Sequence, residues 1–361
     1  MPVLTVSSLP NAHPAVIHFP IALLLTALAV EFVALRLTHH GWLDRTASLL
    51  WILGAVGSGA AFLTGRAAGD GLGLVSPDVQ AALARHANLA LWTVAAAGAM
   101  ALLRLVLLWP RVGTRIHPRV GVAGKLGLGL AVVALVGFTA DRGGTLVYRY
   151  GAAVTAPGET KPEPPSAPAA SEPRRVPLTR VPGGGLRWSP EPGDAASLND
   201  AVTVIAGAGV ITAETATGET AAGLALRADG LAFLLLPGEF ADVQVEAAFD
   251  PTDFVGTVGV LHHFHDEGSY GAFALVGAAS RLSVRRGDGF EVLDEGRGTR
   301  GQGEVTLAVS SVGSHVKGFL GSETVAHGHT PALPAGRVGL LIDGRGTLRV
   351  LELRAEPASN H

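Results

Sequence analysis

Four long runs of apolar residues dominate the first part of the chain. They cover residues 15–37, 47–65, 87–109 and 120–140. Each run is about as long as the roughly 20 residues that a helix needs to cross the hydrocarbon core of a bilayer. A helix on the surface of a soluble protein would carry a polar stripe along one side, and these runs carry none. The pattern predicts an all-α four-helix transmembrane bundle over residues 1–155.

The pattern changes to alternation in the second half of the chain. Polar and apolar positions alternate in 242–249, 281–285, 305–309 and 348–353. Alternation is typical of strands that bury one face. Gly, Asp and Pro recur between these segments at the short intervals that turns require. We therefore expect an all-β antiparallel sandwich over residues 186–361, which makes the chain a multidomain membrane protein.

The stretch between the two predicted domains is rich in proline. Residues 156–185 contain few large apolar side chains, and Pro recurs among Ala, Ser, Glu and Arg. Such a composition favours an extended, semi-rigid segment. We expect a spacer that holds the sandwich away from the membrane.

Charge and cysteine content narrow the function classes. Charged residues make up 16% of the chain, below the roughly 25% of an average soluble protein. Lys and Arg outnumber Asp and Glu by 11 to 5 up to Thr155, whereas the acids prevail by 25 to 16 in the remainder. A net charge of −3 argues against a nucleic-acid partner. With no cysteine, the chain has no disulfide, no thiolate nucleophile and no c-type haem attachment.

The first half resembles a bacterial membrane family known as domain of unknown function 2231. The resemblance lies in the opening motif His13–Leu23, in Gly65–Asp70, in His86 and in Gly144–Gly151. Tyr150 stands where the family often has a histidine. The resemblance covers residues 10–155 and implies a four-helix membrane domain, with the lipid bilayer as its first partner.

The distribution of Lys and Arg predicts the orientation of the bundle. The first and third loops together hold seven of these residues, against two for the N-terminus and the second loop. Cytoplasmic loops carry the excess of positive charge. We expect a bacterial cytoplasmic (inner) membrane protein with both termini and the sandwich outside the cytoplasm.

Polar residues of the bundle gather toward the predicted outer face. Two neutral imidazoles on facing helices could hold haem b axially, and His18 and His86 are the candidate pair, with His13 as a further candidate. The alternative is that these histidines cap helices or bond to loops. Three other polar residues are expected at the same face: Asp70, Asp141 and Tyr148.

Two charged residues lie deep in the predicted spans. Glu31 and Arg104 are 13 and 18 residues below the level of His18 and His86. A carboxylate in a membrane requires a partner, so an ion pair or hydrogen bond between them is expected. A proton-relay role for Glu31 is the alternative.

The second half resembles concanavalin-A-like and laminin-G-like sandwiches, with the 3-keto-disaccharide hydrolase type as the nearest subtype. The similar segments are Glu239–Glu246, Gly259–Leu261, Gly268–Phe273, Pro334–Leu340 and Leu348–Leu353. This resemblance implies a jelly-roll fold. No run of paired carboxylates of the kind that retaining glycosidases carry is present, so these motifs predict no catalytic residue.

One segment of the second half is dense in metal ligands. It reads His262-His263-Phe264-His265-Asp266-Glu267. On a regular strand, His263 and His265 share a face, and with Asp266 they could hold a metal. The alternative is a polar strand end that runs into a turn.

Three functions remain open at this point. The first is a membrane anchor or subunit of a larger assembly whose sandwich binds a glycan or a protein subunit. The second is a haem b electron-transfer subunit, and the third is a sugar-processing enzyme that acts in the sandwich. We expect the first. This expectation is an analogy at the level of the fold, since folds of this kind host both binding and hydrolysis.

Overall fold

The computed structural model of the chain divides into two compact units. One contains residues 1–71 and 85–154, and the other contains residues 72–84 and 155–361. The described parts of the chain are residues 12–108, 118–152, 178–193, 198, 200–207, 209–214, 222–298 and 303–358. Most of the expected proline-rich spacer therefore lies outside the described residues.

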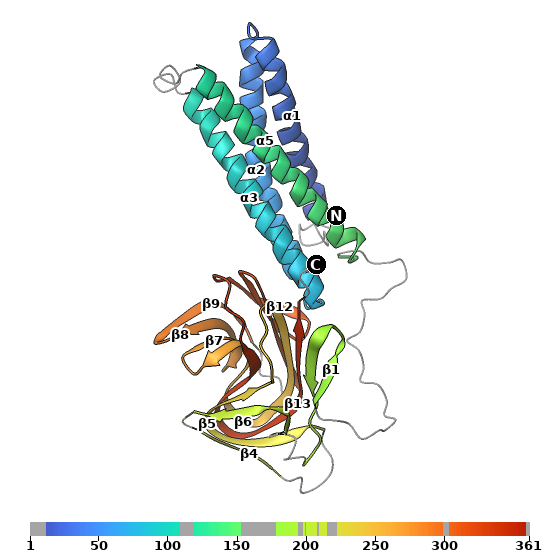
Figure 1. Ribbon diagram of the computed structural model, residues 1–361, viewed down its shortest axis with the longest axis vertical. Helices are drawn as coiled ribbons and strands as arrows, with labels where there is room; N and C mark the ends of the chain where they lie inside the picture. Colours follow the sequence, from blue (N-terminus) through green and yellow to red (C-terminus); the bar gives the residue numbers. More distant parts are fainter. Residues whose placement is uncertain are drawn as a thin grey trace, which may run out of the picture. The chain divides into compact units, whose positions relative to one another are not determined.

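The first unit is built from long helices (Figure 1). They are α1 (His13–Arg36), α2 (Gly41–Gly71), α3 (Pro77–Leu108) and α5 (Pro118–Tyr148). All four contain a stretch long and apolar enough to cross a membrane. Both α3 and α5 begin at a proline, whose missing N–H costs nothing in the first turn of a helix. The four predicted spans are confirmed, and each of the first three helices extends into polar residues beyond at least one end of its apolar run.

The helical unit carries large apolar side chains on its surface as well as in its interior. Large apolar side chains such as Phe19, Leu63, Trp92 and Phe138 are exposed. In water such a surface would be unusual for a monomeric protein, whereas in lipid it faces hydrocarbon. Between the helices lies a buried apolar cluster: Leu24, Ala27, Leu28, Ala47, Trp51, Ala97, Met100, Val132 and Val136. This distribution of apolar side chains is what a membrane bundle requires.

The second unit is an antiparallel β-sandwich. Its strands are β1 (Leu178–Val181), β2 (Gly185–Trp188), β3 (Thr203–Ala206), β4 (Val210–Ala213), β5 (Leu224–Leu235), β6 (Val243–Asp266), β7 (Ser269–Val276), β8 (Ala279–Arg286), β9 (Gly289–Arg297), β10 (Val305–Val312), β11 (His315–Leu320), β12 (Glu323–His329) and β13 (Arg337–Pro357). A short 3₁₀ turn, η2 (Pro182–Gly184), joins β1 to β2. The predicted all-β class is confirmed.

Two long strands belong to both layers of the sandwich. The first layer has the strand order β1-β2-β13-β6-β10-β11-β12. The second part of β6 pairs with β7, and the second layer continues from β7 to β8 and β9. The layers face each other, because a Cβ on Gly318 of β11 would lie 2.4 Å from the Phe273 ring of β7. Apolar residues of both layers meet in one core, among them Val245, Leu307 and Leu282.

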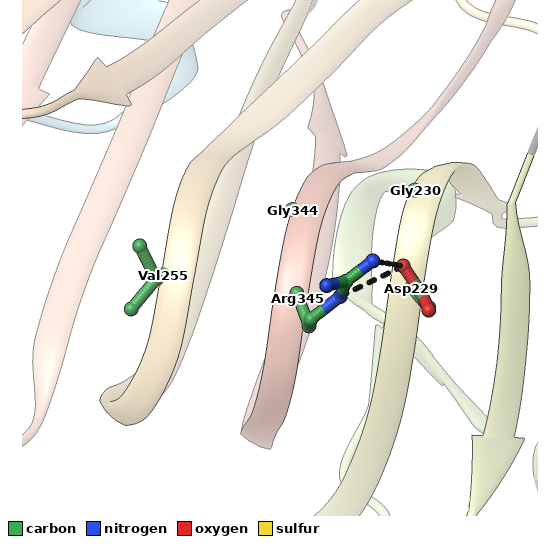
Figure 2. A pocket seen from close by; sticks show the side chains of 5 residues that line it. All are labelled: Asp229, Gly230, Val255, Gly344 and Arg345. Atoms are coloured by element: carbon green, nitrogen blue, oxygen red, sulfur yellow. Dashed lines mark hydrogen bonds and ion pairs between the residues drawn. The ribbon is translucent and has the colours of Figure 1, made fainter.

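A row of glycines marks the line along which the long strands bend. Gly344 of β13 pairs with Gly230 of β5 on one side and with Gly256 of β6 on the other. A Cβ on Gly344 would lie 2.3 Å from the Val255 carbonyl oxygen, so only glycine fits. Figure 2 shows the three strands side by side at this point, where they line a shallow depression. The exposed Arg345–Asp229 ion pair spans it at 3.0 Å.

The sheet begins earlier than the sequence predicted. Strand β1 pairs with β2 from Leu178↔Trp188 to Val181↔Gly185. Residues 178–185, expected at the end of the spacer, therefore belong to the sandwich. In this segment Leu178 packs against the core while Thr179 and Arg180 stay exposed, and so short a segment beside prolines shows no regular alternation.

Candidate functional site

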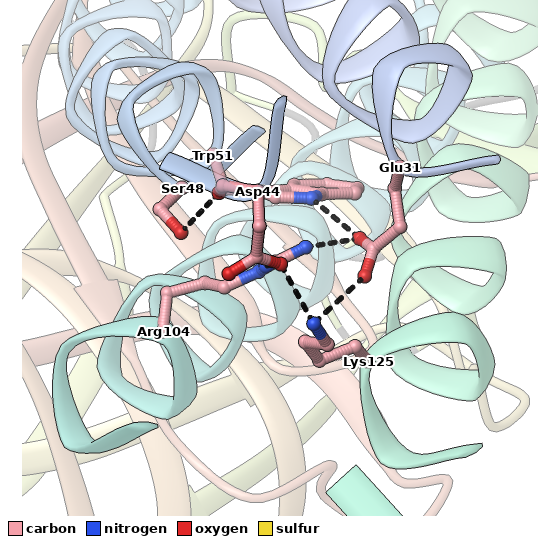
Figure 3. A network of polar contacts seen from close by, with 6 residues as sticks. All are labelled: Glu31, Asp44, Ser48, Trp51, Arg104 and Lys125. Carbon is pink, nitrogen blue, oxygen red and sulfur yellow. Dashed lines mark hydrogen bonds and ion pairs between the residues drawn. The ribbon is translucent and has the colours of Figure 1, made fainter. Parts of the chain in front are cut away.

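One charged residue from each helix meets inside the bundle (Figure 3). Glu31 comes from α1, Asp44 from α2, Arg104 from α3 and Lys125 from α5. Arg104 donates from one terminal nitrogen to Glu31 Oε2 and from the other to Asp44 Oδ1 at 3.0 Å. Lys125 Nζ donates to Asp44 Oδ1 at 2.8 Å. The expected pairing of Glu31 with Arg104 is present, and it is part of a four-charge network.

The network is electrically balanced, and its Glu31–Arg104 half is buried whereas Asp44 is half exposed. Two acids face two bases, and the side chains of Glu31 and Arg104 are 3% and 1% exposed. The indole N–H of Trp51 also donates to Glu31 Oε2, at 3.1 Å. Glu31 Oε2 thus accepts hydrogen bonds from α2 and α3, an arrangement suited to fixing helices to one another. The network therefore ties all four helices together near one end of the bundle, between the α1–α2 and α3–α5 connections.

At the other end of the bundle, His13 and not His18 is the neighbour of His86. The His13 ring lies against Gly65, and its Nδ1 is 3.2 Å from Thr64 Oγ1. It is also within electrostatic range of His86. His18 is exposed and its Nδ1 donates to the carbonyl of Pro14 in its own helix. Five residues turn a helix by about 140° beyond one full turn, so His13 and His18 face different sides.

This arrangement does not support the expected haem site. His86 Nδ1 donates to the Thr139 carbonyl oxygen at 3.1 Å, and a Cβ on Gly143 would lie 3.1 Å from the same ring. The His86 ring is thus already packed against α5. The pair His18 and His86 shares no contact among the described residues, and the expectation of haem b between them gains no support.

The three residues of the expected outer-face cluster, Asp70, Asp141 and Tyr148, differ in their exposure. Asp141 is exposed and lies 3.9 Å from Arg142, its neighbour in sequence. Tyr148 is 92% exposed. Asp70 is half-buried near the end of α2.

On the sandwich, polar side chains form a row across five strands. The row follows the register Glu356↔Gln244↔Ser310↔Lys317↔His327, through β13, β6, β10, β11 and β12. Neighbouring strands lie about 4.8 Å apart, so the row spans roughly 19 Å. These residues point away from the apolar core, because the core takes the alternate positions Val245, Val309 and Val316. We call these five residues the polar row.

The polar row contains hydrogen-bonding groups that are hidden from solvent. Gln244 and Ser310 are 8% and 4% exposed. The Gln244 Oε1 atom has no hydrogen-bond partner among the described residues, and neither has Nε of Arg354 beside it. Buried polar atoms are nearly always hydrogen-bonded. Such atoms on the face of a sheet are the feature of this chain that most resembles a binding site.

A protonation-sensitive carboxyl adjoins the polar row. Glu246 follows Gln244 on the same face of β6 and pairs with Arg354 in register. Burial raises the pKa of Glu246, the nearby Arg354 opposes that shift, and the acids Glu352 and Glu356 add to it. A carboxyl of this kind holds its proton to a higher pH than a free one, and it donates a hydrogen bond when protonated.

The expected metal site of His263, His265 and Asp266 is not formed. The pairing of β6 with β7 is irregular between His262 and Asp266, and His263 has a φ of 52°. This break in the alternation turns His263 inward while His265 stays exposed. Asp266 Oδ1 accepts the backbone N–H of Gly268 at 2.8 Å. The segment is therefore a strand end that runs into a turn, as the alternative interpretation had it.

The inward turn creates a buried histidine pair. His263 Nε2 lies 2.6 Å from the Ala241 carbonyl oxygen and therefore donates to it. His263 Nδ1 is then an acceptor for the N–H of His262 Nδ1, at 2.8 Å. Burial lowers the pKa of His262 well below 6.5 and also lowers the pKa of His263. Both rings are consequently neutral at physiological pH.

Two features of the sites escaped sequence reasoning for different reasons. Asp44 lies just outside the second apolar run, and its position in the first turn of α2 suggested only a helix start. The polar row depends on register between strands far apart in sequence. The only usable signal was the polar position at every second residue, which solvated strand faces share.

Comparison with known proteins agrees with this division of the chain. Residues 10–156 match the family described as "Predicted membrane protein (DUF2231)". No curated protein matches the chain.

Three solved structures are similar at low identity. The carbohydrate binding module CBM66 from Bacillus subtilis is 17% identical, with 40% of this chain and 94% of that one covered at a TM-score of 0.34. A Bacillus subtilis protein of unknown function with a galectin-like fold is 11% identical. The match covers 48% of this chain and 96% of that one at a TM-score of 0.35. Caenorhabditis elegans galectin LEC-6 is 14% identical. The match covers 34% of this chain and 89% of that one at a TM-score of 0.28.

These low values assign no ligand to the chain. The membrane assignment rests on the family match together with four helices long and apolar enough to span a bilayer. Residues 10–156 are thus similar to the DUF2231 family of predicted membrane proteins, and in this chain a β-sandwich follows them.

Proposed function

We propose that the chain is a membrane-anchored binding protein whose sandwich holds a glycan on the polar row. The observation that carries this proposal is the unpartnered Gln244 Oε1, buried in the middle of a row of polar side chains. A ligand that hydrogen-bonds to Gln244 would satisfy an atom that has no partner among the described residues.

The mixture of groups favours a hydroxyl-rich ligand of low charge. Gln244 and Ser310 both donate and accept hydrogen bonds. The row has one acid, Glu356, and one fixed base, Lys317, so its charges balance. A polyanion such as nucleic acid would require a surplus of positive charge. Sugar hydroxyls, which donate and accept at each position, match this pattern.

The orientation of the anchor completes the proposal. Seven Lys and Arg lie in or beside the first and third connections, against two for the N-terminus and the second connection, and this favours a cytoplasmic location for the first and third connections. The sandwich would then be displayed outside the cytoplasm, where it meets extracellular or envelope glycans. Binding rather than hydrolysis is proposed, because the two acids near Glu246 are held in ion pairs, Glu356 by Arg354 and Glu352 by Arg187.

We expect the purified full-length chain to bind at least one neutral oligosaccharide from a panel of glucan, xylan, arabinan and galactan fragments. Loss of one hydrogen bond in a buried site costs about 1–2 kcal/mol, so Ser310→Ala and Gln244→Ala should each weaken binding roughly tenfold. The measurement is isothermal titration in detergent micelles.

The matched control is Ser283→Ala, which removes an equally buried serine from β8 in the other layer. It should leave the affinity unchanged. Binding that is indifferent to Gln244 and Ser310, or absent across the panel, would contradict the proposal.

A further inference from the structure

Three histidines that the sequence scatters over two strands converge at one edge of the first layer. His315 begins β11, and His327 and His329 lie at the end of β12. His315 pairs directly with His329, and His327 lies two residues before His329 on the same face. The ring centroids are 4.6 Å apart for His315 and His329, 5.1 Å for His327 and His329, and 6.0 Å for His315 and His327.

The donor atoms of this triad are close enough to share one ion. One ring nitrogen from each histidine lies within 4.8 Å of the other two. In a tetrahedral zinc site with Zn–N bonds of 2.0–2.1 Å, ligand nitrogens are about 3.3 Å apart. The difference of at most about 1.5 Å is within reach of side-chain rotation, and two of the three rings are only half-buried.

The backbone beneath the triad is fixed by its neighbours. The N–H of His327 donates to Asp294 Oδ2 of β9 at 2.8 Å. Ladder pairing holds β11 against both β10 and β12. A pair of adjacent strands thus presents the three rings from a defined platform. Lys317, which pairs with His327 in register, is an adjacent positive charge, and it opposes rather than assists cation binding.

We propose that His315, His327 and His329 form a binding site for a divalent transition-metal ion of the zinc class. Imidazole nitrogen suits Zn²⁺, Cu²⁺ and Ni²⁺, whereas Ca²⁺ and Mg²⁺ require oxygen ligands that this triad lacks. Three protein ligands leave a fourth position for water or for a group of a bound molecule. The site is distinct from the His263 segment. It shares His327 with the polar row, but its test involves no glycan, so its failure can be distinguished from a failure of the function proposed above.

The test is metal binding by the full-length protein after chelator treatment. Titration with Zn²⁺ should show one site, and Co²⁺ should give the visible absorption of a tetrahedral nitrogen-ligated ion. His327→Ala and His329→Gln should each weaken the Zn²⁺ affinity at least tenfold. Excess Mg²⁺ or Ca²⁺ should not displace Zn²⁺.

The control is His265→Gln, which removes an exposed histidine of the same sandwich outside the triad. Its affinity for Zn²⁺ should equal that of the unmodified chain. Because His329 is exposed, His329→Gln is expected to fold, as circular dichroism would verify, even if His327→Ala does not. Equal Zn²⁺ affinity in His329→Gln and the unmodified chain, or a Co²⁺ spectrum of the hydrated ion alone, would overturn the proposal.

Discussion

Arg104→Met is expected to lower the free energy of unfolding of the helical bundle by about 3–5 kcal/mol. The substitution removes the principal partner of Glu31, whose side chain is 3% exposed, and leaves a buried carboxylate with insufficient compensation. Lys125 Nζ, at 3.8 Å from Glu31 Oε1, is too distant to replace the hydrogen bond. The measurement is denaturant unfolding of the full chain in mixed micelles, followed by the helical circular dichroism signal.

The double variant separates pairing from packing. Glu31→Gln/Arg104→Met keeps the Asp44–Lys125 pair and leaves no unpaired charge, so it should recover a large part of the loss. Replacing both partners of a buried ion pair is often close to neutral. Arg45→Met, which removes an exposed arginine beside Asp44, is the control and should have little effect. If the double variant loses as much stability as Arg104→Met and Glu31→Gln lose separately when added together, the charges of Glu31 and Arg104 are not coupled.

The stability of the sandwich is expected to fall steeply as the pH drops below about 6.5. His262 and His263 have lowered pKa values in the folded state, whereas in the unfolded chain they titrate near 6.5. Between the two values the unfolded state binds more protons, so lowering the pH favours unfolding. Each histidine contributes a slope of up to about 1.4 kcal/mol per pH unit in this window. Above pH 7 the contribution is constant.

The pH effect is measured by urea unfolding of the full chain, followed by the β-sheet signal between pH 5 and pH 8. His262→Phe retains a ring beside Gly271 but cannot titrate, so it should reduce the slope below pH 6.5 even if it lowers stability at pH 8. His265→Gln, at an exposed position, is the control and should keep the full slope. An unchanged slope in His262→Phe would exclude the buried pair as its origin.

The parts of the fold that depend on local pattern were predictable from the sequence. Apolar runs without a polar stripe predicted the four helices, and alternation predicted strands such as 242–249 and 305–309. The helix ends were predicted less well, since apolar residues alone defined the runs. Helix α2, for example, continues through polar residues up to Gly71. Strand β1 was missed, since four residues among prolines give too little pattern to detect.

The sites depend on side-chain direction and register, which the sequence predicts poorly. Glu31 and Arg104 were paired correctly because buried charges in a bilayer need partners, yet Asp44 and Lys125 were not added to the pair. His18 was preferred over His13 because it lies further inside the helix. The direction in which each side chain points around α1 was not predicted, and it is His13 that faces α2. For His263 and His265, the positive φ at His263 broke the alternation on which the prediction relied.

The central claim is that the membrane bundle displays the sandwich outside the cytoplasm, and cysteine accessibility tests it most directly. The chain contains no cysteine, so single substitutions give an unambiguous signal. Val210→Cys lies on the sandwich, at a position 66% exposed, and His40→Cys lies in the exposed α1–α2 connection. In intact cells a membrane-impermeant maleimide should label Val210→Cys, and it should label His40→Cys only after the membrane is opened. Labelling of His40→Cys but not Val210→Cys in intact cells would contradict the claim.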